Sequence, residues 1–154
     1  MTLASPDLID ATEATQNPFA LGYALLAYGF ACREAHPDRV LAALRRGLVI
    51  AQDTGNRNIE SNLAMTLARQ EAELSDLLGA LDHTTLAMRN FHDSGNTAVI
   101  RIPLAWLATF LDRLGRSDSA AIIAGFAFSP LSAVLGADPG ANAPAARGVR
   151  SRRP

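Results

Sequence analysis

One short phrase occurs three times in this chain, and this repetition limits the possible folds more than any other feature. The phrase is Leu-Ala within an apolar stretch, and its copies begin at Leu26, Leu63 and Leu104. A second phrase, a hydroxyl residue followed by Gln or Gly and then Asn, ends at Asn17, Asn56 and Asn96. Successive copies lie 37 to 41 residues apart. Self-similarity at this period is typical of stacked helical hairpins.

The composition favours helices over strands. Apolar residues make up 49% of the 154 residues but aromatic residues only 6%, and alanine and leucine dominate. Both residue types have high helix propensity. Alternating runs of β-branched and aromatic residues, which indicate strands, are missing. We therefore expect a single all-α domain.

Capping and breaking residues divide the repeated region into three helix pairs. The first helices of the pairs are expected over about 18–35, 57–74 and 97–114, and Pro103 should kink the third or delay its start. The second helices are expected from Asp38 to Gly55, from Asp76 to Gly95 and over 119–128. Asn, Asp and Gly are common at such helix ends.

The domain boundaries follow from these pairs. Residues 1–16 form a polar segment in which Ser5 and Pro6 begin a short, loosely attached helix. Residues 17–136 are the repeat domain, with units of about 17–54, 55–94 and 95–136, and Leu131–Leu135 adds one further turn. Residues 137–154 are rich in Ala, Pro, Gly and Arg, so we expect them to be disordered.

Each expected helix has an apolar side. In the first helix of the second pair, Ile59, Leu63 and Leu67 form one row, and Ala64, Ala68 and Ala72 form the next. Leu104, Leu107, Leu111 and Leu114 form the corresponding stripe in the third pair. Stacking the pairs would bury these stripes. The apolar edge at the C-terminal end would stay open, so we expect a homodimer there or a longer relative that covers it.

The paired helices resemble tetratricopeptide-like repeats, although the units exceed 34 residues. The resemblance implies a right-handed α-solenoid of about three antiparallel pairs. The segment 111–127, with the sequence LDRLGRSDSAAIIAGFA, is similar to the helical C-terminal region of bacterial STAND-type signalling ATPases, including LuxR-family regulators and cyclase-linked relatives. The chain lacks the phosphate-binding loop of those ATPases, so the resemblance implies only a sensor or scaffold role.

The charge pattern argues against nucleic acid as the main partner. The 14 basic residues are all Arg and the net charge is −1. Every acidic residue lies within 1–138, whereas the tail carries Arg147, Arg150, Arg152 and Arg153. A nucleic-acid-associated regulator that uses this tail is the alternative function, and its binding would be weak and salt-dependent.

The location is expected to be cytoplasmic. The chain begins without the basic and apolar regions of a secretory signal, and Phe19–Ala31 is too short to span a bilayer. Cys32 is the only cysteine, which fits a reducing compartment.

The candidate chemistry does not assemble into an active site. His36, His83 and His92 lack metal-ligand spacing. Glu71 and Glu73 point to different sides of one helix, so we expect both to be solvated. Cys32 is expected to be an apolar filler. We therefore predict a non-enzyme without cofactor or metal.

The remaining candidates would bind a protein or peptide. They lie on the first helices of the pairs, and they are Arg33, Arg57, Asn62, Arg69 and Arg101. Arginine suits bidentate binding of a peptide carboxylate, although solvated helix faces explain the same pattern more simply. Tyr28, Met65 and Trp106 occupy equivalent positions in the repeated phrase and could line a groove, but packing between helices is the favoured interpretation.

These observations favour a non-catalytic helical-repeat module that mediates protein–protein interaction. The resemblance implies a role as a sensor or scaffold in bacterial signalling or transcriptional regulation. The sequence does not identify the partner.

Overall fold

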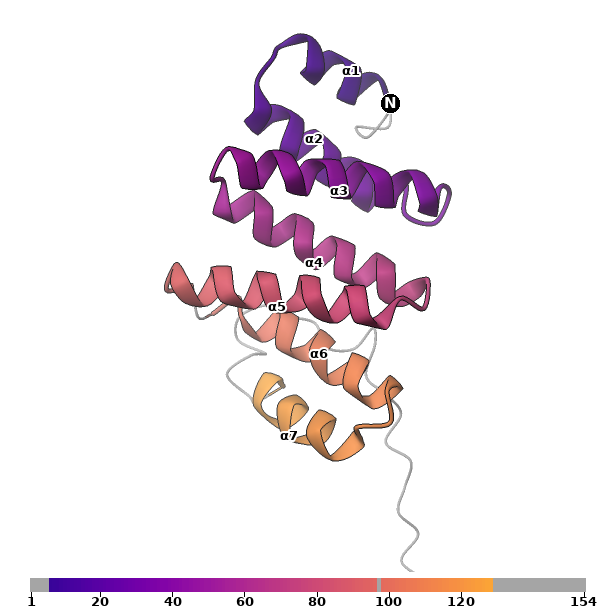
Figure 1. Cartoon of the computed structure of the whole chain (residues 1–154), viewed down its shortest axis with the longest axis vertical. Helices are drawn as coiled ribbons and strands as arrows, with labels where there is room; N and C mark the ends of the chain where they lie inside the picture. Colours follow the sequence, from indigo (N-terminus) through magenta and orange to yellow (C-terminus); the bar gives the residue numbers. More distant parts are fainter. Residues whose placement is uncertain (1–5, 97, 129–154) are drawn as a thin grey trace, which may run out of the picture.

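A computed structural model describes residues 6–96 and 98–128, and within these ranges the protein is entirely helical (Figure 1). This confirms the all-α class. The helices are α1 (Pro6–Ala14), α2 (Pro18–Ala31), α3 (Pro37–Asp53), α4 (Arg57–Glu73), α5 (Leu77–Asp93), α6 (Arg101–Arg113) and α7 (Ser117–Ala127). The expected tail, the turn at Leu131–Leu135 and the cap at Ser5 lie outside the described residues.

The helices follow one another along the long axis of the molecule, and each packs against the next (Figure 1). Two further contacts skip a helix, because α2 touches α4 and α4 touches α6. The helices α2, α4 and α6 therefore form a connected layer. Helix α4 is central, since it contacts α2, α3, α5 and α6.

Side-chain caps fix the start of three helices as the sequence predicts. Asn17 accepts hydrogen bonds from the amides of Phe19 and Ala20, and Asn56 accepts one from Ile59. Asp76 caps α5 through the amide of Gly79. These bonds satisfy amides that have no partner within the helix.

The predicted cap at Asp38 is wrong. Helix α3 begins one residue earlier, at Pro37, so Asp38 lies inside the first turn. Proline suits this position because it has no amide hydrogen to satisfy and its φ angle is already helical. The cap position falls to His36, whose side chain makes no capping bond.

The turns repeat more regularly than the Leu-Ala phrase. Gly55 and Gly95 follow α3 and α5 with φ angles of 67° and 70°. Ser75 and Gly115 follow α4 and α6 with φ angles of 69° and 75°. Each pair is 40 residues apart, whereas Leu63 and Leu104 are 41 apart. One residue of offset turns a helix by about 100°, so the copies of the phrase are not equivalent in the structure.

Burial shows the effect of this offset. Leu63 and Ala64 are fully buried, whereas Leu104 and Ala105 are half-exposed. In the predicted leucine stripe of the third pair, Leu104, Leu107 and Leu111 are partly buried, and none of the four leucines is fully buried. The buried positions of α6 are Pro103, Ala108 and Phe110, and Leu114 is 42% exposed.

The larger core cluster joins α2, α3, α4 and α5. In α4 both predicted rows, the one from Ile59 and the one from Ala64, are buried. Small residues let the helices approach closely. A Cβ atom added at Gly47 of α3 would lie 3.0 Å from Leu63 Cδ2. The core therefore depends on small residues placed opposite large ones.

Some helix ends differ from the expected ranges. Helix α2 ends at Ala31 rather than Ala35, and α7 begins at Ser117 rather than Ser119. The delayed start predicted from Pro103 is confirmed, since α6 begins at Arg101 and proline is tolerated only within a first helical turn. The short N-terminal helix is confirmed as α1, and Ile9 packs against the larger core cluster.

Two glycine substitutions test the role of the turns. Gly55→Ala should lower the free energy of unfolding by about 1 kcal/mol, because an alanine is strained at this positive φ angle. The strain is in the backbone alone, since no atom lies within 4 Å of the added Cβ. The matched control is Gly125→Ala, at an exposed and equally uncrowded site inside α7. It should raise stability by about 0.5–1 kcal/mol. Urea unfolding measures both, and equal effects would contradict this explanation.

Candidate functional site

An exposed aromatic strip runs along α2. Phe19, Tyr23 and Phe30 are 52%, 55% and 60% exposed. They lie four and seven residues apart, so they share one side of the helix. Six other residues of α2 are buried, and they are Gly22, Ala24, Leu25, Leu26, Tyr28 and Gly29. Large aromatic side chains at this exposure contribute heavily to binding when a partner covers them.

The exposed strip of α4 continues this surface. Most of α4 is buried. Beyond Arg57, which is exposed at the first position of the helix, the more accessible positions form one row: Asn58, Asn62, Met65, Arg69 and Glu73. The caps Asn17 and Asn56 place the two helices in register, 39 residues apart. In this register Phe19, Tyr23 and Phe30 correspond to Asn58, Asn62 and Arg69.

Helix α6 adds Trp106, Thr109 and Arg113 at the other edge of α4. Two contacts connect the three helices at their C-terminal ends. Arg33, just after α2, has its Nε 3.7 Å from Oε2 of Glu73. Arg113 Nη1 donates a hydrogen bond of 2.7 Å to the carbonyl oxygen of Ala72. We call the surface made by these strips the α2–α4–α6 face.

A cavity of about 150 Å³ opens on this face between α4 and α6. Arg69, Glu73, Trp106, Thr109 and Arg113 are among the residues that line it. The cavity thus combines guanidinium groups, a carboxylate and an aromatic ring. Chemically, it can bind an anionic group beside an apolar one.

Three of the five predicted partner-binding residues lie on the α2–α4–α6 face. Arg69 Nε donates to Oε1 of Glu73 at 3.1 Å, and Arg33 approaches the same carboxylate. Asn62 lies in the middle of the α4 strip, where its Nδ2 donates to the carbonyl oxygen of Asn58 at 2.8 Å. Asn62 and Arg69 come from α4, and Arg33 comes from the turn that follows α2.

The other two predicted residues lie elsewhere. Arg57 contacts Glu60 at 3.0 Å and Asn90 of α5 at 3.2 Å. The guanidinium carbon of Arg101 lies 5.5 Å from the ring centre of Phe126 on α7, in a cation–π arrangement. Arg57 and Arg101 therefore connect helices and do not join the face.

The expected solvation of Glu71 is wrong. Its side chain is 2% exposed, whereas Glu73, two residues later, is 45% exposed. Both carboxylate oxygens of Glu71 have partners. Oε1 accepts from Arg45 of α3 at 3.1 Å, and Oε2 lies 2.7 Å from Nδ1 of His83 on α5. The buried carboxylate therefore joins α3 to α5 across α4.

A second buried carboxylate has the same role at the other end of α4. Glu60 is 2% exposed and pairs with Arg57, while Gln52 of α3 donates to its Oε1 at 3.3 Å. Arg57 in turn reaches Asn90 of α5. Two polar links thus hold α3, α4 and α5 in register, and their residues serve packing.

The other candidates have structural surroundings. Cys32 and Met65 pack against the larger core cluster, and Tyr28 is buried in it. Trp106 packs against a smaller cluster of Ala68, Ala72, Ala80 and Phe110. Packing is therefore confirmed for these side chains, while Trp106 also borders the cavity. Within residues 6–96 and 98–128, no three His, Cys, Asp or Glu side chains gather where they could hold a metal ion.

Sequence reasoning missed the aromatic strip and Arg113. Phe19, Tyr23 and Phe30 stood within an apolar stretch, and their helical spacing was the signal that they share one side. The position of Arg113 depends on how α6 packs against α4, and no residue pattern in the chain indicates this packing.

Comparisons with protein-family models, with curated proteins and with solved structures found no match to this chain. The similarity to STAND-type ATPases therefore stays a prediction. Along the described part of the chain, every helix is too short or too polar to cross a membrane.

Two substitutions on α4 test the buried carboxylate. Glu71→Ala should destabilise the protein by about 2–3 kcal/mol, because it removes the carboxylate that links Arg45 to His83 and leaves a cavity at a buried position. The matched change Glu73→Ala, at an exposed position, should cost less than about 0.5 kcal/mol. Chemical unfolding of the two variants gives the comparison. Similar losses in both would refute the structural role of Glu71.

Proposed function

We propose that this chain is a non-catalytic module that binds a protein or peptide partner through the α2–α4–α6 face. The aromatic strip Phe19, Tyr23 and Phe30 is the observation that carries the proposal, because exposed aromatic side chains in a row are costly to leave in water. The neighbouring amides and arginines supply hydrogen-bond donors for the backbone and carboxylates of a bound segment.

We further propose that the pairs α2–α3, α4–α5 and α6–α7 are repeats of a right-handed, tetratricopeptide-like α-solenoid. The 40-residue recurrence of the turns, at Gly55 and Gly95 and at Ser75 and Gly115, supports this interpretation. So do the contacts of α4 with α2 and α6. In such arrays the first helices of the pairs line a continuous binding surface.

The proposed cellular role is that of a sensor or scaffold in bacterial signalling or transcriptional regulation, in the cytoplasm. It rests on the similarity of residues 111–127 to the helical regions of STAND-type ATPases. A docking module without catalytic groups is compatible with that role.

The binding proposal is tested with a peptide selected from a random displayed library against the whole chain. Tyr23→Ala should weaken its binding at least about tenfold, because aromatic anchors carry much of the energy of an interface. Isothermal titration calorimetry measures the affinities.

The matched control is Leu78→Ala, which removes an apolar side chain that is 74% exposed on α5. It should leave the affinity unchanged. Equal affinities for wild type and Tyr23→Ala, or a larger loss with Leu78→Ala, would refute binding at the α2–α4–α6 face.

The homodimer also remains a proposal. Ile122 and Phe126 lie four residues apart on α7 and are 76% and 60% exposed, so a second copy could cover them. Analytical ultracentrifugation should then show a dimer that Ile122→Asp dissociates into monomers. A monomeric wild-type chain at high concentration would contradict this proposal.

A further inference from the structure

Three arginines gather at one end of the α2–α4–α6 face. Arg33 follows α2, Arg69 is in the last turns of α4, and Arg113 ends α6. Two carboxylates pair with them. That of Glu73 lies 3.1 Å from Arg69 Nε and 3.7 Å from Arg33 Nε, and that of Glu34 lies 3.5 Å from Arg33 Nη2. Arg113 instead donates to the backbone of Ala72, which uses one of the five N–H groups of its guanidinium. Positive charge therefore exceeds negative charge at the cavity between α4 and α6.

Glu73 indicates what this cavity can bind. Its carboxylate is 45% exposed and lines the cavity together with Arg69 and Arg113. A carboxylate from another molecule would meet the same guanidinium groups. Exposed ion pairs are weak, so an incoming carboxylate that also buries apolar surface can displace Glu73.

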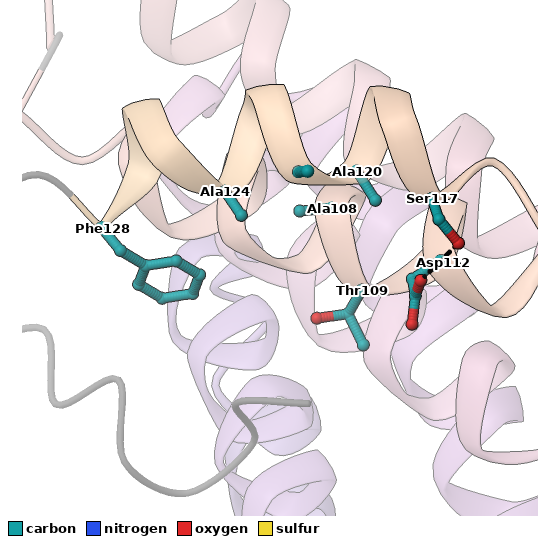
Figure 2. Close-up of a pocket in the computed structure, with 8 residues that line it drawn as sticks. Ala108, Thr109, Asp112, Ser117, Ala120, Ala124 and Phe128 are labelled. Atoms are coloured by element: carbon teal, nitrogen blue, oxygen red, sulfur yellow. Dashed lines mark hydrogen bonds between the residues drawn. The ribbon is translucent and has the colours of Figure 1, made fainter. Parts of the chain in front are cut away.

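Apolar surface is available on both sides of Thr109. On one side the cavity is bordered by Trp106. On the other side a second hollow, of about 170 Å³, lies between α6 and α7 and is also lined by Thr109 (Figure 2). Figure 2 shows Ala120 and Ala124 along this hollow, Phe128 at one end and the hydrogen-bonded pair Ser117 and Asp112 at the other.

We propose that the cavity at Arg69, Arg113 and Trp106 binds a carboxylate of the partner, with an adjoining apolar side chain of the same segment covering Thr109. The inference rests on the proposed function and specifies its ligand as a peptide with a carboxylate next to an aliphatic residue. Glu73 occupies the site in the free protein and competes with the ligand.

Trp106 provides a direct readout, because it is the only tryptophan of the chain and it lines the cavity. The probes are N-acetyl-leucine and N-acetyl-leucinamide, which share a side chain and differ in the carboxylate. We expect N-acetyl-leucine to change the tryptophan fluorescence saturably, with an affinity at least about tenfold higher than that of the amide. Equal affinities, or no saturable change with the acid, would overturn the inference.

Substitutions of arginine identify the groups that bind the carboxylate. Arg69→Gln and Arg113→Gln should each abolish the preference for the carboxylate. The matched control Arg89→Gln, at an exposed site on α5, should keep it. Far-ultraviolet circular dichroism monitors the fold of each variant. A preference that survives in both Arg69→Gln and Arg113→Gln would overturn the inference.

Glu73→Gln should change the affinity for N-acetyl-leucine in the opposite direction to the arginine substitutions. Removing the internal competitor should strengthen binding of N-acetyl-leucine by about three- to tenfold, an effect that a purely structural Glu73 would not produce. Weaker or unchanged binding in Glu73→Gln would overturn the inference.

Failure of this inference can be told apart from failure of the proposed function. If the affinity of selected peptides depends on Tyr23 but not on Arg69 or Arg113, the proposed binding function is supported and the carboxylate site is refuted. If the affinity of selected peptides does not depend on Tyr23, while the affinity of N-acetyl-leucine depends on Arg69 and Arg113, the carboxylate site is supported and binding through the aromatic strip is refuted.

Discussion

Helix α4 is buried among its neighbours, and this burial determines how the other helices are arranged. This helix contacts α2, α3, α5 and α6, and its apolar rows are almost free of solvent exposure. Small residues make such close packing possible, as at Gly47, where an added Cβ would approach Leu63 Cδ2 to 3.0 Å. Beyond the exposed Arg57 at its start, α4 presents one accessible strip, from Asn58 to Glu73. The same packing that forms the core thus determines which surface remains for a partner.

Polar groups fix the register of this packing. An apolar core alone tolerates sliding of one helix along another, because leucine and alanine contacts are not directional. The carboxylates of Glu60 and Glu71 lie near the two ends of α4 and hydrogen-bond to side chains from its neighbours. Buried polar groups of this kind require defined geometry. We infer that these two links keep the strips of α2, α4 and α6 aligned.

The sequence predicted three helix caps and both apolar rows of α4, but it misplaced the cap of α3 and missed the polar contacts between helices. Asn17, Asn56 and Asp76 cap helices as expected, because capping involves only neighbouring residues. The Leu-Ala phrase misled the comparison of units, because in an alanine- and leucine-rich chain such phrases recur by chance and a shift of one residue changes the exposed side. Glu71 was expected to be solvated, because its pairing with Arg45 and His83 can be predicted only when the helices that flank α4 are known.

The candidate site was predicted in part. Arg33, Asn62 and Arg69 were predicted from the sequence and lie on one face, whereas the aromatic strip and Arg113 were recognised only from the packing of the helices.

Side-chain nuclear magnetic resonance signals, recorded with and without a selected peptide, show which surface of the protein binds. If the strip left open on α4 is the binding surface, the side-chain amide signals of Asn58 and Asn62 and the indole signal of Trp106 should shift on binding. The amide signals of Gln52 and Asn90, at the links between α3, α4 and α5, should stay in place. Shifts confined to Gln52 and Asn90 would contradict the claim that burial of α4 directs the partner to the α2–α4–α6 face.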